Sequence, residues 1–144
     1  MIVNADHTRK QLLDIWPNFP TQNIWLPSGP YYLPTIEEAK SLVVANRVDS
    51  LPFKRHVREC EKFAAFLYAD IQRKVAEIYD YTHSIGIVIG DNIKSNPAGG
   101  THTCNIVFTR SGVFLIEPQN CMFWSPVGPI TSIDQNDFLF YLYM

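Results

Sequence analysis

Apolar residues recur with two different periods along this chain, and the change of period separates a helical part from a sheet part. Between residues 57 and 79 they fall at steps of three and four, the spacing of one face of an α-helix. We therefore expect a long amphipathic helix over Val57–Tyr79. Its apolar stripe consists of Val57, Cys60, Ala64, Leu67, Ile71, Val75 and Ile78, widened by Phe63 and Phe66.

Two shorter helices are expected before it. Thr35 and Glu38 form a capping box, in which the threonine caps the helix and the glutamate lies three residues on. This helix should run to about Ala45. Residues 1–34 contain five prolines and are rich in tryptophan and tyrosine, a composition that excludes a long helix. We expect this segment to wrap the surface, with one short helix over Thr8–Ile15.

The second half of the chain has the composition of strands. Its apolar runs are rich in β-branched and aromatic residues and are separated by turn residues. Helices followed by antiparallel strands predict an α+β fold, in which N-terminal helices pack on an antiparallel β-sheet. A length of 144 residues suits a single domain, 1–144, with its own core. The expected strands are Ser84–Ile89, His102–Phe108, Val113–Gln119 and Phe138–Tyr143.

The hairpin in this region determines which polar side chains share a face, because side chains alternate along a strand. A four-residue loop over Thr109–Gly112, counted back along both strands, sets His102 opposite Gln119. Glu117 then lies diagonal to His102 on the same face and within side-chain reach. A three-residue loop would place Glu117 on the opposite face. A two-residue loop would restore the face but leave Glu117 four positions along the strand, roughly 13 Å away and too far to reach His102. The pairing of histidine and carboxylate therefore depends on the four-residue register.

Composition and charge narrow the possible partners. The net charge of −2 and the scattered basic residues do not predict a nucleic-acid partner. No apolar run is long enough to span a membrane and no signal-peptide pattern is present, so we expect a cytoplasmic protein without a membrane partner. Three cysteines without CxxC spacing do not predict a disulfide scaffold. A zinc site built from Cys60, Cys104, Cys121 and a histidine stays open as an alternative.

Cys60 and His102 are the candidates for nucleophilic chemistry. His102 follows a Gly-Gly pair and faces a carboxylate, which favours it for proton transfer. If the long helix begins near residue 58, Cys60 lies in its first turn, where unpaired N–H groups and the helix dipole favour a thiolate. If the helix begins at residues 50–52, Cys60 lies too deep and is a packing residue. His83, a rival histidine, is expected at a surface or junction position.

Four short blocks stand out along the chain: Tyr31–Glu38, Glu59–Ala64, His102–Ile106 and Ile116–Gln119. They resemble successive motifs of the papain-like cysteine peptidases. The resemblance is to the branch that includes the papain-like C-terminal domain of the fungal Marasmius agglutinin and small phage and bacterial proteins. The resemblance implies a papain-like fold. It also implies Cys60 as nucleophile, His102 as general base and then acid, Glu117 as the residue that orients the imidazole, and Gln119 as a second polar group that orients His102 or the substrate.

The resemblance implies acyl transfer through a cysteine thioester, most simply hydrolysis of a peptide or amide substrate. The same triad also serves transglutaminases and cell-wall amidases. No cofactor is required, and calcium is implied by the resemblance alone. Lys62 follows Glu61 where the family often has a second acidic residue, and hard cations need carboxylate oxygens. The alternative is a catalytically silent binding or assembly protein, such as one of phage origin, that keeps the fold without turnover.

Overall fold

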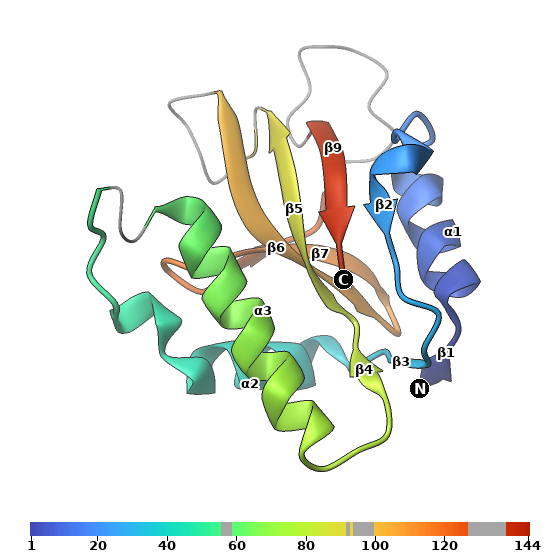
Figure 1. The fold of residues 1–144 in the computed structure, drawn as a ribbon, viewed down its shortest axis with the longest axis horizontal. Coiled ribbons are helices and arrows are strands. Elements are labelled where there is room, and N and C mark those ends of the chain that lie inside the picture. The colour runs from blue at the N-terminus through green and yellow to red at the C-terminus, as the bar shows by residue number, and fades with distance from the viewer. Residues whose placement is uncertain (56–58, 92, 94–99, 127–137) are drawn as a thin grey trace.

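The computed structural model describes residues 1–55, 59–91, 93, 100–126 and 138–144. In these residues three α-helices and two β-sheets are found (Figure 1). The helices are α1 (Ala5–Ile15), α2 (Ile36–Asn46) and α3 (Cys60–Ala76). The strands are β1 (Ile2–Val3), β2 (Ile24–Trp25), β3 (Tyr31–Tyr32), β4 (Thr82–His83), β5 (Ile85–Asp91), β6 (Thr101–Thr109), β7 (Gly112–Glu117), β8 (Met122–Trp124) and β9 (Phe138–Tyr143).

The larger sheet has six strands in the order β2-β9-β5-β6-β7-β8 and forms the middle layer of the molecule. Figure 1 shows α3 and α2 on one side of it and α1 on the other. The strand β6 serves both sides, because its side chains alternate between the two faces. Ile106 and Phe108 lie in one buried cluster with Leu12 of α1, whereas Val107 lies in another with Phe63 of α3. The predicted α+β fold is confirmed.

Two features of the sheets differ from the prediction. The pairs β2–β9 and β3–β4 are parallel, so neither sheet is purely antiparallel. Residues 1–34 do not simply wrap the surface, because Trp16, Tyr31 and Leu33 are buried in the core on the α1 side. This segment supplies much of the apolar cover of that sheet face. Its short helix is confirmed and begins earlier than predicted, at Ala5, after the N-cap Asn4.

The helix α2 begins as its capping box predicts. The Glu38 N–H donates to Thr35 Oγ1 (3.1 Å), and the Thr35 N–H donates to Glu38 Oε2 (2.7 Å). Two of the unpaired N–H groups at the helix start are thus satisfied reciprocally.

The helix α3 is shorter than predicted at both ends. It stops at Ala76, so Ile78 lies beyond it and is 70% exposed. Phe66 lies outside the buried stripe and is 44% exposed, so its assignment to the core was wrong. Val57 lies outside the described residues. The residues buried against the sheet are Phe63, Ala64, Leu67, Ile71 and Val75.

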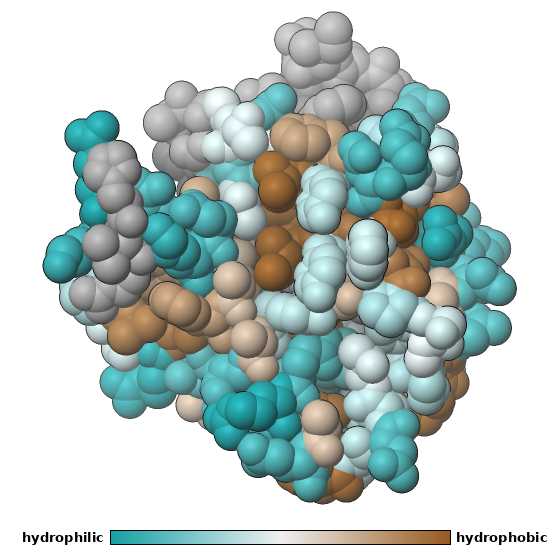
Figure 2. Space-filling view, viewed as in Figure 1, coloured by the Kyte–Doolittle hydropathy of each residue, from teal (hydrophilic) through white to brown (hydrophobic). Residues whose placement is uncertain are grey.

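The surface shows no sign of a membrane-spanning helix. Among the described residues, no helix combines the length and apolarity that crossing a bilayer would require. The face in Figure 2 is largely polar, with apolar surface along β5 in its middle. Ile87 and Ile89 of that strand are half-buried.

Candidate active site

Cys60 is the first residue of α3, so its thiol lies in the first turn of the helix. The preceding residue, Glu59, is the N-cap; its backbone is extended (φ −99°, ψ 176°) and its side chain makes no capping hydrogen bond. The first N–H groups of a helix have no acceptor within the helix. This end of α3 is therefore polar at the point where the half-buried Cys60 is placed.

The hairpin of β6 and β7 has the predicted register. Phe108 pairs with Val113, as expected. Thr109 also pairs with Gly112, so the connection consists of Arg110 and Ser111 and the predicted four-residue loop was wrong. This two-residue turn has the same centre as the predicted loop, so it does not move Glu117 away from His102. The extra pair lengthens the ladder without shifting it. Gly112 has φ of +132°, a conformation that residues with side chains rarely adopt and that closes this short turn.

This register brings His102 and Glu117 together. His102 Nε2 lies 2.7 Å from Glu117 Oε2, and the two side chains are only 10% and 5% exposed. The second carboxylate oxygen, Oε1, accepts a hydrogen bond from the backbone N–H of Gln119 (3.2 Å). Gln119 thus contacts the pair through its backbone. The part predicted for its side chain stays a prediction.

The sulfur of Cys60 reaches the same pair. A hydrogen bond with His102 lowers the pKa of the thiol, burial opposes this, and a hydrogen bond from the backbone N–H of Thr103 adds to the lowering. The pairing of β6 with β7 ends at Asn105, so the first residues of β6 extend beyond the partner strand. The N–H of Thr103 is therefore not taken up by β7 and can bond to the sulfur. The sulfur lies at this uncovered end of β6.

The charge state of His102 completes the arrangement. Burial alone would lower the pKa of the imidazole, but the hydrogen bonds to Cys60 and Glu117 outweigh it and raise that pKa to about 9. Because Glu117 takes Nε2, Nδ1 is the ring nitrogen available to the sulfur. A lowered thiol pKa and a raised imidazole pKa both favour a thiolate–imidazolium pair at neutral pH.

The remaining thiols differ from Cys60. Cys104 is fully buried in the core on the α1 side. Cys121 is half-buried, and burial raises its pKa. Within the described ranges, no group of three or more His, Cys, Asp or Glu side chains is placed so that it could hold a metal ion. The zinc site that the sequence left open, built on the three cysteines, is therefore wrong.

The structure also refines one assignment and adds two residues to the site. His83 is 2% exposed and its backbone bonds to the side chain of Gln72 in α3, so it lies at a buried junction and not at the surface, and it is not part of this site. Thr103 was missed by the sequence analysis, and Glu61 was considered only in connection with calcium. The Thr103 N–H donates to the sulfur, and Glu61 Oε2 lies 3.7 Å from it. The only signal in the sequence was that each directly follows a candidate residue.

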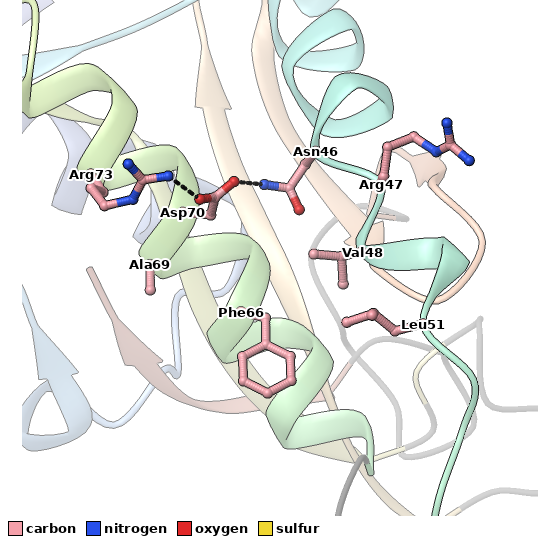
Figure 3. A pocket seen from close by; sticks show the side chains of 8 residues that line it. All are labelled: Asn46, Arg47, Val48, Leu51, Phe66, Ala69, Asp70 and Arg73. Atoms are coloured by element: carbon pink, nitrogen blue, oxygen red, sulfur yellow. Dashed lines mark hydrogen bonds and ion pairs between the residues drawn. The ribbon is translucent and has the colours of Figure 1, made fainter.

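Two well-formed pockets lie away from the triad. One of about 430 Å³ lies between the end of α2 and the outer side of α3, where Figure 3 shows Asp70 between Arg73 and Asn46, with a hydrogen bond to each. The other, about 550 Å³, lies between α2 and the C-terminal end of α3 and includes Tyr81 and His83. Cys60, His102 and Glu117 line neither pocket.

Comparisons with known proteins identify the fold. No protein-family model and no curated protein sequence matches the chain. Among solved structures, the Polyporus squamosus lectin bound to the human-type influenza-binding epitope Neu5Acα2-6Galβ1-4GlcNAc matches with a TM-score of 0.72 and 20% identity, over 98% of this chain and 49% of the lectin. The PSL1a–E64 complex matches with a TM-score of 0.73 and 20% identity, over 98% of this chain and 50% of the other. The chain spans about half the length of these structures, and at this identity the likeness establishes a shared fold.

Proposed function

We propose that this protein is a papain-like cysteine hydrolase that transfers acyl groups through a thioester on Cys60, most simply by hydrolysing a peptide or related amide. The observation that carries the proposal is the convergence of three side chains from three elements. The Cys60 sulfur hydrogen-bonds to His102, and the same imidazole lies 2.7 Å from Glu117. A thiol at a helix start, with a base that a third group orients, is the general arrangement of an activated nucleophile.

The first half-reaction uses both charges of the pair. The Cys60 thiolate attacks the carbonyl carbon of the amide, and the resulting oxyanion faces the Cys60 N–H at the start of α3. The His102 imidazolium gives its proton to the leaving nitrogen as the C–N bond breaks. An amine departs, and a thioester with a neutral imidazole remains.

The second half-reaction restores the starting state. His102 takes a proton from water as the water oxygen attacks the thioester carbonyl. The C–S bond then breaks, a carboxylic acid leaves, and the thiolate–imidazolium pair is regenerated. Glu117 holds the ring throughout, and this sequence of steps needs no cofactor.

The substrate has an apolar surface to contact near the sulfur. Ile89 pairs directly with Thr103 across β5 and β6, so the two side chains share a face. Ile89 is half-buried, and apolar surface runs along β5 in Figure 2. A peptide extended over this strand would cover it.

Alkylation by iodoacetamide near neutral pH tests the proposal. Cys60 should react at least roughly tenfold faster than Cys121, because only Cys60 has an imidazole to stabilise the thiolate. Both thiols are half-buried, so Cys121 is an internal control for access. His102→Ala should abolish the difference, and the exposed control variant His7→Ala should preserve it. Equal and slow labelling of Cys60 and Cys121 would contradict the proposal.

Turnover is a separate measurement. The epoxide E64 alkylates nucleophilic thiols and should label Cys60 in the native protein but not in His102→Ala. Release of amine from a mixed peptide-amide library should occur with the native protein and stop in Cys60→Ala. Labelling without turnover would indicate a catalytically silent protein.

The silent alternative has one observation in its favour. The first structure named above is a lectin with a bound sialylated trisaccharide, which suggests carbohydrate binding in place of a peptide substrate. Titration of Neu5Acα2-6Galβ1-4GlcNAc into the Cys60→Ala variant separates the two functions. Binding in that variant, together with no amide turnover in the native protein, would favour the binding function.

A further inference from the structure

Glu61 places a carboxylate beside the nucleophile, although the steps proposed above make no use of it. The Cys60 sulfur lies 3.7 Å from Glu61 Oε2, within reach of a thiol-to-carboxylate hydrogen bond. A negative charge at this distance disfavours the thiolate, and Glu61 indeed raises the pKa of Cys60 against the larger lowering by His102. An opposing charge next to a nucleophile calls for a separate explanation.

The charge of Glu61 is only weakly engaged by its described neighbours. Lys62 Nζ lies 3.8 Å from Glu61 Oε1, and the two side chains are 38% and 49% exposed. An ion pair of this length between exposed groups contributes little and is readily exchanged. The Glu61 carboxylate is therefore available to a cation that approaches the sulfur.

We propose that Glu61 makes the site selective for acyl substrates that carry a positive charge close to the scissile carbonyl, such as peptides with lysine or arginine there. This inference rests on the proposed function of Cys60. During attack the sulfur bonds to the carbonyl carbon, so the neighbouring substrate groups come within a few ångströms of Glu61. The carboxylate attracts an ammonium or guanidinium group there and repels an acid.

A carboxylate in the first turn of α3 also interacts with the helix dipole, so the control must reproduce that effect. Glu37 occupies the first turn of α2, is exposed, and borders the pocket at the C-terminal end of α3. That end is roughly 24 Å from Cys60 at the helical rise. Glu37→Gln therefore removes a first-turn carboxylate without changing the charge beside the sulfur.

The experiment measures the charge selectivity of Cys60 with thiol reagents of one shape. The full chain, carrying Cys121→Ser, is treated with the cationic 2-aminoethyl and the anionic 2-sulfonatoethyl methanethiosulfonate. In each case the thiolate attacks the sulfenyl sulfur, a disulfide forms and methanesulfinate leaves. Glu61→Gln should lower the cation-to-anion rate ratio by roughly ten- to thirtyfold, because the loss of one charge near 4 Å changes each rate by up to about fivefold, in opposite directions, in a mostly aqueous setting. The difference should shrink at 1 M salt.

The outcomes separate this inference from the proposed function. Glu37→Gln should leave the ratio within about twofold of the parent. Suppose that Glu61→Gln leaves the cation-to-anion ratio unchanged while neutral iodoacetamide still alkylates Cys60 fast. This result would overturn the role of Glu61 in selectivity and leave the role of Cys60 as nucleophile intact. Slow alkylation by iodoacetamide in every variant would overturn the nucleophile itself. The pH profile of alkylation should also move to lower pH in Glu61→Gln, because the opposing charge is gone.

Discussion

His102 and Glu117 lie fifteen residues apart in sequence and 2.7 Å apart in space, joined across the β6–β7 hairpin and almost fully buried. Their contact depends on the hairpin register, since a one-residue slip would turn Glu117 to the other face of the sheet. The Gln119 N–H holds the free oxygen of the carboxylate. The imidazole is therefore fixed from one side and presents its other nitrogen to Cys60.

Glu117→Gln should lower the pKa of His102 from about 9, because the amide keeps the shape of the side chain but not its charge. With less imidazolium beside it, the Cys60 thiolate is less favoured, and its alkylation near pH 7 should slow by roughly tenfold, one pKa unit of lost interaction. NMR titration of the ring signals measures the first effect and iodoacetamide kinetics the second. Glu77→Gln, which removes an exposed carboxylate paired with Arg73, is the control. An unchanged His102 titration would refute the pairing.

The pairing of His102 with Glu117 also predicts how the free energy of unfolding changes with pH. The folded pKa of His102 lies above its ordinary value of 6.5, so its contribution is complete below pH 6.5 and is lost as pH rises through about 9. A Cys60→Ser background removes the thiol titration and also the share of the raised His102 pKa that is due to Cys60. In that background the free energy of unfolding should still fall as pH rises, over a smaller part of this range. Urea unfolding at pH 6 and pH 9 measures it, and Glu117→Gln should reduce the fall. A greater fall in that variant would contradict the assignment.

Local chemistry made part of this structure predictable. The capping box at Thr35 depends on neighbours in sequence, so the start of α2 could be derived directly. The alternation around Gly112 left several loop lengths open, and the register was chosen because it lets Glu117 reach His102. The parallel pairing of β2 with β9 joins residues more than a hundred positions apart and leaves no local signature. The contact of Cys60 with His102 likewise depends on how α3 packs on β6. The sequence suggested it only through family resemblance.

Burial patterns were less predictable than the elements themselves. A stripe of apolar residues continues to Ile78, but helix α3 ends at Ala76, and nothing in the spacing marks that end. Trp16 and Tyr31 looked like surface anchors, because prolines surround them in sequence. They are core residues, because the sheet face opposite α3 needs apolar cover.

His83 should make the protein acid-sensitive. Its side chain is 2% exposed, both ring nitrogens lack a hydrogen-bond partner among the described residues, and burial lowers its pKa to about 4. The folded pKa lies below the ordinary 6.5, so stability is complete above pH 6.5 and falls by about 3 kcal/mol as pH drops to 4. His83→Leu should remove that part of the fall and lose none of the described hydrogen bonds. Urea unfolding at pH 7 and 4.5 measures the fall in the free energy of unfolding, with exposed His7→Leu as control. The same fall in His83→Leu and in His7→Leu would contradict the burial of a neutral ring.

Asn105 connects α3, the helix that begins at Cys60, to the sheet. Its Nδ2 donates to the carbonyl oxygens of Ala64 (2.9 Å) and Gly86 (3.0 Å), and its side chain is fully buried. Asn105→Leu keeps a similar volume but removes both bonds, which should destabilise the fold by about 2–3 kcal/mol. Because Ala64 lies one turn from Cys60, alkylation of Cys60 should also slow in the folded variant, measured in buffer without denaturant. A stable variant with normal Cys60 kinetics would show that this contact does not position α3.

Gly86 of β5 has no room for a side chain, and this offers a sharp test of the sheet's packing. A Cβ added there would lie 2.7 Å from Met144 Cγ and 2.8 Å from the Tyr143 carbonyl oxygen. The methionine can move aside, but the carbonyl belongs to the backbone of β9, which pairs with β5. Gly86→Ala should therefore destabilise the fold by about 1–3 kcal/mol.

Gly29→Ala is the matched control for Gly86→Ala, because the nearest atom to its added Cβ, Thr82 Oγ1, is at an ordinary 3.8 Å. Urea unfolding of the two variants should differ in midpoint, with Gly29→Ala close to the native protein. Adding Met144→Ala relieves only the flexible contact, so it should restore part of the stability lost in Gly86→Ala and leave the share due to the Tyr143 carbonyl. Full restoration would mean that the β9 backbone yields at this position. In that case β9 would not hold β5, and with it the strand that carries His102, in a fixed place.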